Sequence, residues 1–248
     1  KLFFACLFKI RQTYKGYDFY SYMTIAIVLC SGGIDSVTAL YLAKKKYERI
    51  IILFFDYGQP QLQGERKAVR HHVKMLNVEF KEIRIILDLY SRTGISKEIS
   101  LKDLKDTKIE CEKYYVPARN LLFLAYAISF AETLKGKLDI VIGFKNEGEE
   151  HYPDTSASFV REMNNISRIA TKNKPRIIAP LIKKDKEDII LLAKKLGVNL
   201  ENTFSCYISR EVHCGLCLAC RLRQEGFYWA NVKDKTKYKK LPKDYRSA

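Results

Sequence analysis

The chain has 248 residues, 47% of them hydrophobic, which is enough for one substantial core and a small appendage. Its longest apolar run, residues 121–131, is too short to cross a bilayer, so the composition argues against a membrane-spanning helix. The net charge of +16 does not indicate nucleic-acid binding, because residues 1–22 and 231–248 together carry half of it and basic tails are usually solvated.

The N-terminal residues stand apart from the rest of the chain. Met23 lies immediately before the first apolar run, and the stretch from Leu2 to Phe8 is short for a signal peptide. We interpret Met23 as the natural start and residues 1–22 as an upstream or poorly structured extension. An N-terminal arm that packs on the domain is the alternative.

The first predicted strand, Ile25 to Cys30, leads into Ser-Gly-Gly-Ile-Asp-Ser at 31–36 and then into a stretch with helical spacing. A strand that turns through two glycines into a helix suits phosphate, because the backbone can approach the anion and the helix N-terminus is partly positive. Ser31 and Ser36 add hydroxyl donors, and Asp35 could hold Mg²⁺. An ordinary tight turn between strand and helix is the alternative.

This loop lacks Gly-Lys-Ser/Thr, so it is not the Walker loop of phosphoryl-transfer ATPases. It resembles the PP-loop of ATP pyrophosphatases. These enzymes cleave ATP between the α and β phosphates and activate an oxygen by adenylation. The resemblance implies an enzyme that uses ATP.

Strands and helices alternate along the rest of the chain. The predicted strands are Arg49–Asp56, Val78–Ile86, Leu138–Gly143 and the short Ile177–Ala179. The predicted helices are Gln63–Leu76, Ala118–Leu134, Ser156–Ala170 and one capped by Asp185 that runs through Lys195. Residues 87–113 show no period and read as a long connection, a candidate mobile flap.

This alternation predicts an α/β fold with a doubly wound, Rossmann-like parallel sheet, whose ligands bind at the carboxyl ends of the strands. Three loops fall there: 31–36, 56–60 and 143–154. We assign residues 23–200 to this ATP-binding domain, 201–230 to a metal-binding segment and 231–248 to a basic tail.

Four of the seven cysteines form a C-x7-C-x2-C-x2-C pattern: Cys206, Cys214, Cys217 and Cys220. Four thiolates at tetrahedral positions are typical of structural zinc, and Gly215 supplies a turn. Disulfides, a redox C-x-x-C and an iron–sulfur cluster are the alternatives, and ligand type alone does not exclude the last. His213 is a weaker candidate ligand, and Cys6, Cys30 and Cys111 read as free thiols.

Seven short motifs in order resemble the 7-cyano-7-deazaguanine synthase family of the queuosine and archaeosine pathways, over about Thr24 to Phe227. They are SGGIDS at 31–36, FDYGQ at 55–59, YVPARN at 115–120, IGFKNEGEEHYPD at 142–154, APLIKKDK at 179–186, TFSCY at 203–207 and CGLCLACRLRQEGF at 214–227. The family implies the adenine nucleotide α-hydrolase type of sheet. It also implies a cytoplasmic homodimer without a membrane or nucleic-acid partner.

The resemblance implies that 7-carboxy-7-deazaguanine, ammonia and ATP give 7-cyano-7-deazaguanine. The carboxylate would attack the α-phosphate, ammonia would displace AMP to give an amide, and a second activation would let the amide oxygen leave. Anionic groups that meet in one place need Mg²⁺ and positive side chains between them. Zn²⁺ would be structural.

The same resemblance assigns the site residues. ATP and its metal would be held by Cys30, Ser31, Gly32, Gly33, Asp35, Ser36, Arg119 and Asn120. Ser31, Asp35, Ser36 and Lys186 would be catalytic, with Lys186 facing the developing phosphate charge. Tyr152 and Asp154 would bind the substrate, with Asp154 accepting N–H groups of the guanine edge. Structural roles are the alternatives: a salt bridge for Arg119, a surface lysine at 186 and a helix N-cap at Asp154.

Some positions depart from the family pattern. Ser156 and Ser158 stand where an arginine and a glutamate are usual, and His151 replaces a glycine. Gln59-Pro60-Gln61 stands where Gln-Arg-His is usual, and the first cysteine spacing is one residue shorter. The final amine acceptor therefore stays open. The alternatives are a paralogue that couples the deazaguanine to another amine such as a protein N-terminus, a PP-loop tRNA-thiolating enzyme, and an ATP-binding regulator without turnover.

Overall fold

The computed structural model describes residues 23–86, 111–112, 114–145 and 152–241. The predictions for residues 1–22, for most of the connection 87–113, for His151 and for the end of the basic tail lie outside these ranges. None of the described helices is long and apolar enough to cross a membrane.

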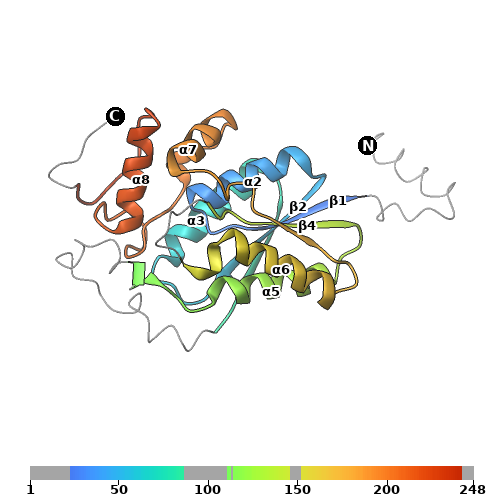
Figure 1. Cartoon of the computed structure of the whole chain (residues 1–248). Helices are drawn as coiled ribbons and strands as arrows, with labels where there is room; N and C mark the ends of the chain where they lie inside the picture. The colour runs from blue at the N-terminus through green and yellow to red at the C-terminus, as the bar shows by residue number, and fades with distance from the viewer. Residues whose placement is uncertain (1–22, 87–110, 113, 146–151, 242–248) are drawn as a thin grey trace, which may run out of the picture.

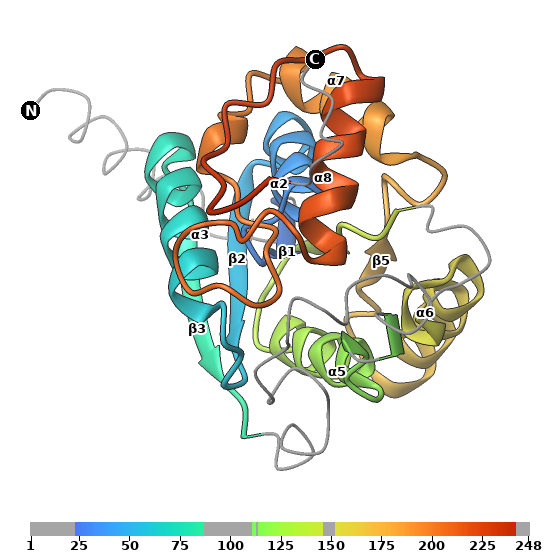
Figure 2. The same ribbon diagram turned by 90° about the vertical axis from the view of Figure 1, so that its left-hand side faces the viewer.

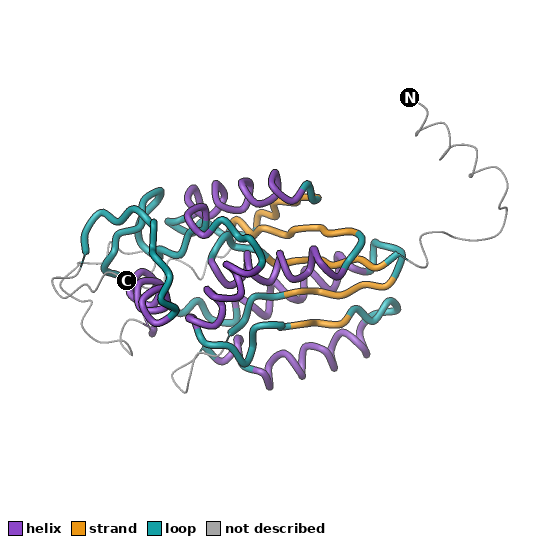
Figure 3. Tube along the Cα trace, turned by 90° about the horizontal axis from the view of Figure 1, so that it is seen from above, coloured by secondary structure: helices purple, strands orange, loops and turns teal. Residues whose placement is uncertain are grey.

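The predicted parallel sheet is confirmed, with five strands in the order β3-β2-β1-β4-β5 (Figures 1 and 3). The strands are β1 (Thr24–Leu29), β2 (Arg49–Asp56), β3 (Glu79–Arg84), β4 (Lys137–Val141) and β5 (Arg176–Ile178). At its centre Ile27 of β1 pairs with Ile51 of β2 and Ile140 of β4. All three are fully buried, as expected for apolar strands covered on both faces.

Helices cover both faces of the sheet (Figure 2). They are α2 (Ile34–Lys46), α3 (Leu62–Leu76), α5 (Arg119–Ala131), α6 (Ala157–Ala170), α7 (Lys186–Lys195) and α8 (Leu218–Trp229). Because side chains alternate along a strand, Ala26 and Val28 pack in a core with α2, α3, α7 and α8. Ile25 and Ile27 pack on the other face with α5 and α6.

The element boundaries differ from the predictions in a few places. The predicted helix 118–134 ends at Ala131, because the next three N–H groups bond three residues back and tighten the last turn. Asp185 occupies the N-cap position of α7, but its side chain accepts no capping hydrogen bond. Helix α8 was not predicted, since its sequence was interpreted only as a carrier of metal ligands.

The sheet reverses its order beside β1, and this reversal positions the site. The chain crosses from β1 to β2 and β3 on one side, then returns to place β4 on the other side of β1. The connections leaving β1 and β4 therefore diverge and open a crevice at their carboxyl ends. A Cβ atom at Gly143, just past β4, would lie 2.7 Å from the backbone nitrogen of Ser36. Only glycine at position 143 therefore allows the chain after β4 to come this close to the start of α2.

Candidate active site

The 31–36 loop joins β1 to α2 as predicted. Gly32 has a φ of 84°, and a Cβ atom there would lie 2.8 Å from the carbonyl oxygen of Glu65, so the position needs glycine on both counts. Gly33 is the N-cap of α2. The Ser36 hydroxyl accepts from the Ser31 backbone N–H at 3.2 Å and donates to the Gly33 carbonyl at 3.2 Å. The loop is thus preformed around the N-terminus of a helix, where an anion is favoured.

Lys186 and Asp35 meet beside this loop. The Nζ atom of Lys186 lies 2.7 Å from each carboxylate oxygen of Asp35, and both side chains are partly buried. Helix α8 packs against this lysine at Gly226, where a Cβ atom would come within 2.3 Å of the Lys186 Cγ. The structure therefore brings together two of the predicted catalytic residues, from opposite parts of the chain.

Arg119, at the start of α5, reaches the same crevice. Its Nη1 donates to the Tyr57 hydroxyl at 3.1 Å, and its guanidinium lies over the rings of Tyr57 and Phe123. Its Nε is buried and has no hydrogen-bond partner among the described residues. A donor in this state suits an anionic ligand, since an unsatisfied buried N–H is costly.

Asp154 and Asn120 form a hydrogen-bonded pair at the start of α5. The buried Asp154 carboxylate accepts from the Asn120 backbone N–H at 2.9 Å, and the Asn120 side chain donates to the Asp154 carbonyl at 3.2 Å. Asp154 therefore satisfies one of the free donors at the start of α5. The N-cap of the next helix, α6, is Ser156, whose hydroxyl accepts from the Phe159 N–H.

A cavity of about 260 Å³ lies beside these residues, but Gly32, Lys186 and Asp154 do not belong to its wall. Of the predicted residues, its wall contains Cys30, Ser31, Gly33, Asp35, Ser36, Arg119, Asn120 and Tyr152. Burial raises the pKa of the Cys30 thiol to about 11, so this thiol stays protonated at neutral pH and is not a nucleophile. The Tyr152 ring stacks on Tyr115 with the planes 11° apart. The wall thus joins the 31–36 loop at one end to an aromatic end, where Tyr152 stacks on Tyr115.

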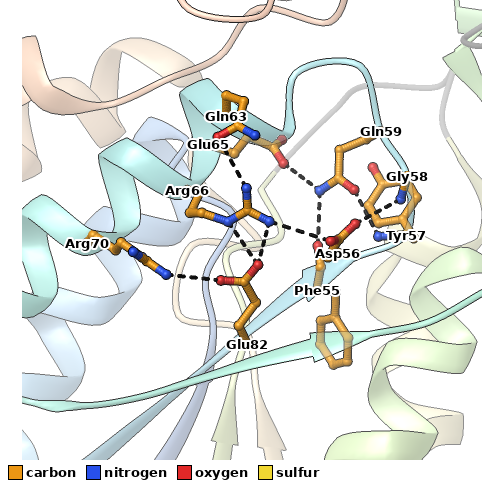
Figure 4. Close-up of polar contacts among 10 residues, drawn as sticks. All are labelled: Phe55, Asp56, Tyr57, Gly58, Gln59, Gln63, Glu65, Arg66, Arg70 and Glu82. Atoms are coloured by element: carbon orange, nitrogen blue, oxygen red, sulfur yellow. Dashed lines mark hydrogen bonds and ion pairs between the residues drawn. The ribbon is translucent and has the colours of Figure 1, made fainter.

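The wall also contains residues to which no role was predicted. Figure 4 shows Glu65 of α3 reaching toward Gln59, whose Nε2 donates to the Glu65 carboxylate at 2.9 Å and to the Phe55 carbonyl at 3.0 Å. Glu65 shares the inner face of α3 with Ala68, Val69 and His72, all of them buried. A glutamate on the helix face that carries Ala68 and Val69 was the sequence signal that could have singled it out.

The four cysteines converge as predicted. The sulfurs of Cys206 and Cys217 lie 3.9 Å apart and those of Cys214 and Cys220 lie 3.8 Å apart, and all four atoms fall within 4.8 Å of one another. Zn–S bonds of about 2.3 Å in a tetrahedron require S–S edges of about 3.8 Å. The N–H groups of Cys217 and Leu216 point at the Cys214 sulfur, as thiolates require. The cluster therefore fits a metal ion. His213 lies outside it and accepts from the Ser205 N–H.

The segment that carries the cysteine cluster, residues 201–230, contacts the 31–36 loop directly. The Phe204 N–H donates to the Gly32 carbonyl at 2.8 Å, and the Phe204 ring packs against Gly64, where a Cβ atom would lie 2.7 Å from it. The buried Arg223 of α8 fixes this stretch, donating to the Thr203 hydroxyl at 2.8 Å and the Leu200 carbonyl at 2.8 Å. Phe204, two residues before Cys206 of the cluster, thus connects the cluster to the loop.

The start of the predicted basic tail lies on this segment. The N–H of Lys239 donates to the His213 carbonyl, and the N–H of Lys240 donates to the Cys214 carbonyl. Gly215 has a φ of 84°, and a Cβ atom there would collide with the Lys240 carbonyl. Glycine at this position therefore leaves room for the backbone of residues 239–240. The residues up to 241 therefore cover the cysteine cluster.

Comparisons with known proteins agree with this geometry. The family model described as queuosine biosynthesis protein QueC matches residues 25–231. The 7-cyano-7-deazaguanine synthase of Pyrococcus abyssi is 34% identical over 239 residues, covering 89% of this chain and 100% of that protein. The enzyme of that name from Nitratiruptor is 40% identical over 225 residues, covering 86% and 98%.

Among solved structures, the NMN synthetase from Francisella tularensis is 17% identical, with a TM-score of 0.46, over 87% of this chain and 80% of that chain. A likeness this distant adds nothing to the assignment. The family model covers most of the chain, and each of these two curated relatives is covered almost completely. The chain belongs to the QueC family of queuosine biosynthesis proteins.

Proposed function

We propose that this protein converts 7-carboxy-7-deazaguanine and ammonia to 7-cyano-7-deazaguanine by two successive ATP-dependent adenylations. The observation that carries the proposal is the cavity, in which the phosphate loop and Arg119 adjoin the aromatic end at Tyr152. A nucleotide phosphate and a planar base acid can meet there. The relatives that bear the name of this activity support the same conclusion.

The phosphate loop binds and orients the triphosphate. The Gly33 N-cap and the Ser31 and Ser36 hydroxyls supply donors at the positive end of α2. Arg119 contributes a buried cation and a free Nε donor. Positive groups held in place before reaction stabilise the charge that develops on the α-phosphate.

Asp35 would bind the metal ion, and Lys186 would stabilise the charge on the leaving pyrophosphate. Carboxylate oxygen is the ligand type that Mg²⁺ prefers, so Asp35 would hold the ion, which supplies positive charge to the phosphates. Lys186 lies within 2.7 Å of that carboxylate, where it can turn toward the pyrophosphate as charge forms there. The four cysteines would hold Zn²⁺ in a structural role, because all four positions around the ion are filled by protein.

The base of the substrate would lie at the aromatic end. Tyr152 offers a stacking surface, and Asp154 would accept guanine-edge N–H groups while it also holds the start of α5. The protein would act in the cytoplasm as a homodimer, with residues 23–200 as the ATP-binding domain and residues 201–230 as its metal-bound support. Residues 1–22 would be an extension of this unit, whereas the residues up to 241 contact its metal-bound support.

The test is a turnover assay on the full chain with its metal. Incubation with 7-carboxy-7-deazaguanine, ATP, Mg²⁺ and ammonium should give the nitrile, AMP and pyrophosphate by mass spectrometry. Protein with Ser36→Ala in the phosphate loop is the control and should not form pyrophosphate. Absence of nitrile from correctly metallated protein would refute the proposal. A product joined to another amine would show that the serines after Asp154 have changed the acceptor.

A further inference from the structure

Nitrile formation requires a proton acceptor that none of the roles assigned so far provides. Ammonia must lose a proton when it displaces AMP, and the amide must lose its two N–H protons when it becomes a nitrile. A side chain held beside the reacting nitrogen takes such protons more effectively than dilute solvent bases do. The acceptor must be ionised near neutral pH and must lie in the cavity wall beside the reacting carbon.

Two carboxylates belong to the described wall of the cavity, Asp35 and Glu65. Asp35 is engaged by Lys186 at 2.7 Å, and this pair lies at the first turn of α2. Glu65 instead accepts a hydrogen bond from the neutral amide of Gln59. The Gln59 amide therefore orients the Glu65 carboxylate without pairing it with an ammonium group.

The position of Glu65 is fixed by the elements around it. It lies in the first turn of α3, directly above Gly32, and the Gln59 amide that holds its carboxylate is itself anchored on the Phe55 carbonyl. Tyr57 and Arg119 line the same cavity. Figure 4 shows Glu65 beside Gln59, between α3 and the end of β2, and both residues belong to the cavity wall.

We propose that Glu65 is the general base of the nitrogen-transfer steps, taking protons from the nitrogen that becomes the nitrile. In the last step the electron pair of an N–H bond becomes part of the C≡N triple bond and the proton passes to the Glu65 carboxylate. The C–O bond to AMP breaks, and its electron pair leaves on AMP. Atoms and charges balance without any further reactant. This inference rests on the proposed function and assigns a residue to it.

The electrostatic surroundings suit that role. Burial raises the pKa of Glu65 to about 7, while the Gln59 hydrogen bond and the charge of Arg119 oppose the rise. The other titratable groups that face it, Tyr57 and Cys30, have pKa values raised by burial and stay neutral. A base with a pKa near the working pH transfers protons most effectively, and its ionised fraction rises with pH through about 7.

Glu65→Gln separates the steps, because glutamine keeps an oxygen to accept the Gln59 hydrogen bond but is not basic. Adenylation of the carboxylate removes no proton from the substrate, so pyrophosphate formation from acid and ATP without ammonia should change by less than about threefold. Conversion of the amide to the nitrile should fall by about 10²- to 10⁴-fold, the usual contribution of a general base. The rise in rate through pH 7 should disappear in the variant.

Glu82→Gln is the matched control. Glu82 holds the same helix through Arg66, outside the cavity, so its variant should keep both steps and the pH profile. Equal losses of adenylation and nitrile formation in Glu65→Gln would assign Glu65 a structural role and overturn the inference, as would unchanged nitrile formation. If the unaltered protein forms no nitrile, the proposed function fails and the inference fails with it.

Discussion

At the residue scale, the Lys186–Asp35 pair tests whether the phosphate end of the cavity performs chemistry. Replacing Lys186 by glutamine removes a cation beside the phosphate loop, and loss of such a group typically lowers kcat by about 10²- to 10³-fold. Stability should change by less than about 1 kcal/mol, because the pair is partly exposed and such pairs contribute little. Pyrophosphate release and the melting temperature measure the two effects.

Lys183→Gln provides the comparison for this change, since Lys183 is exposed on the loop before α7. It should retain full activity. A Lys186→Gln protein that releases pyrophosphate at the normal rate would show that the lysine only neutralises Asp35. A Lys186→Gln protein that loses much of its stability but keeps its activity would also show that the lysine only neutralises Asp35.

Residue roles were harder to predict than residue positions. The serines, the glycines and Arg119 came from short motifs whose chemistry is local, and the structure places them in the cavity wall or beside it. Glu65 was missed because its role depends on contacts with Gln59 and with the end of β1, which only the folded chain brings together. The Asp154 contact with Asn120 is likewise a tertiary one that spacing alone does not reveal.

At the element scale, the packing of α8 on α7 depends on Gly226. Glycine to alanine in a helix interior normally stabilises by about 1 kcal/mol. Here the added Cβ would come within 2.3 Å of the Lys186 Cγ and 3.0 Å of the Ile190 Cδ1. Overpacking of this kind costs about 1–3 kcal/mol, so Gly226→Ala should lower the melting temperature by several degrees. It should also reduce pyrophosphate release, because Lys186 is displaced from Asp35.

Glu225→Ala, at the exposed neighbouring position of α8, controls for helix propensity and should leave both quantities unchanged. A Gly226→Ala protein that is more stable and fully active would mean that α7 and α8 can separate without consequence.

Periodicity predicted the helices that cover the sheet because their apolar faces repeat regularly. Helix α8 buries Cys220, Arg223 and Gln224 instead, and a face with two polar side chains gives no such pattern.

At the scale of the whole molecule, the strand order explains why the site is where it is. The alternation of strands and helices predicted the parallel sheet, but not that β4 would lie beside β1. That neighbour depends on long-range contacts such as Gly143 against the start of α2. The same holds for the residues up to 241, which were expected to be a solvated tail and instead contact the metal-binding segment through His213 and Cys214.

Removal of the metal tests whether the cysteine cluster stabilises the phosphate loop. The binding free energy of a structural zinc, about 10–16 kcal/mol in small domains, is as large as the stability of a typical domain, so segment 201–230 should not stay folded without its ion. Phe204 would then leave the Gly32 carbonyl, and the phosphate loop would lose a contact that holds its shape. Chelation should lower the melting temperature and also abolish ATP binding, although no cysteine of the cluster lies in the cavity wall.

Calorimetric titration with ATP before and after chelation measures this coupling, and elemental analysis identifies the metal, with one zinc per chain expected. Cys214→Ser should reproduce the loss, whereas Cys111→Ser, outside the cluster, should bind ATP normally. Restoring zinc should restore ATP binding, since the loop itself is unaltered. Metal-free protein that binds ATP with unchanged affinity would show that the cluster stabilises only its own segment. The Phe204–Gly32 hydrogen bond would then have no part in forming the phosphate site.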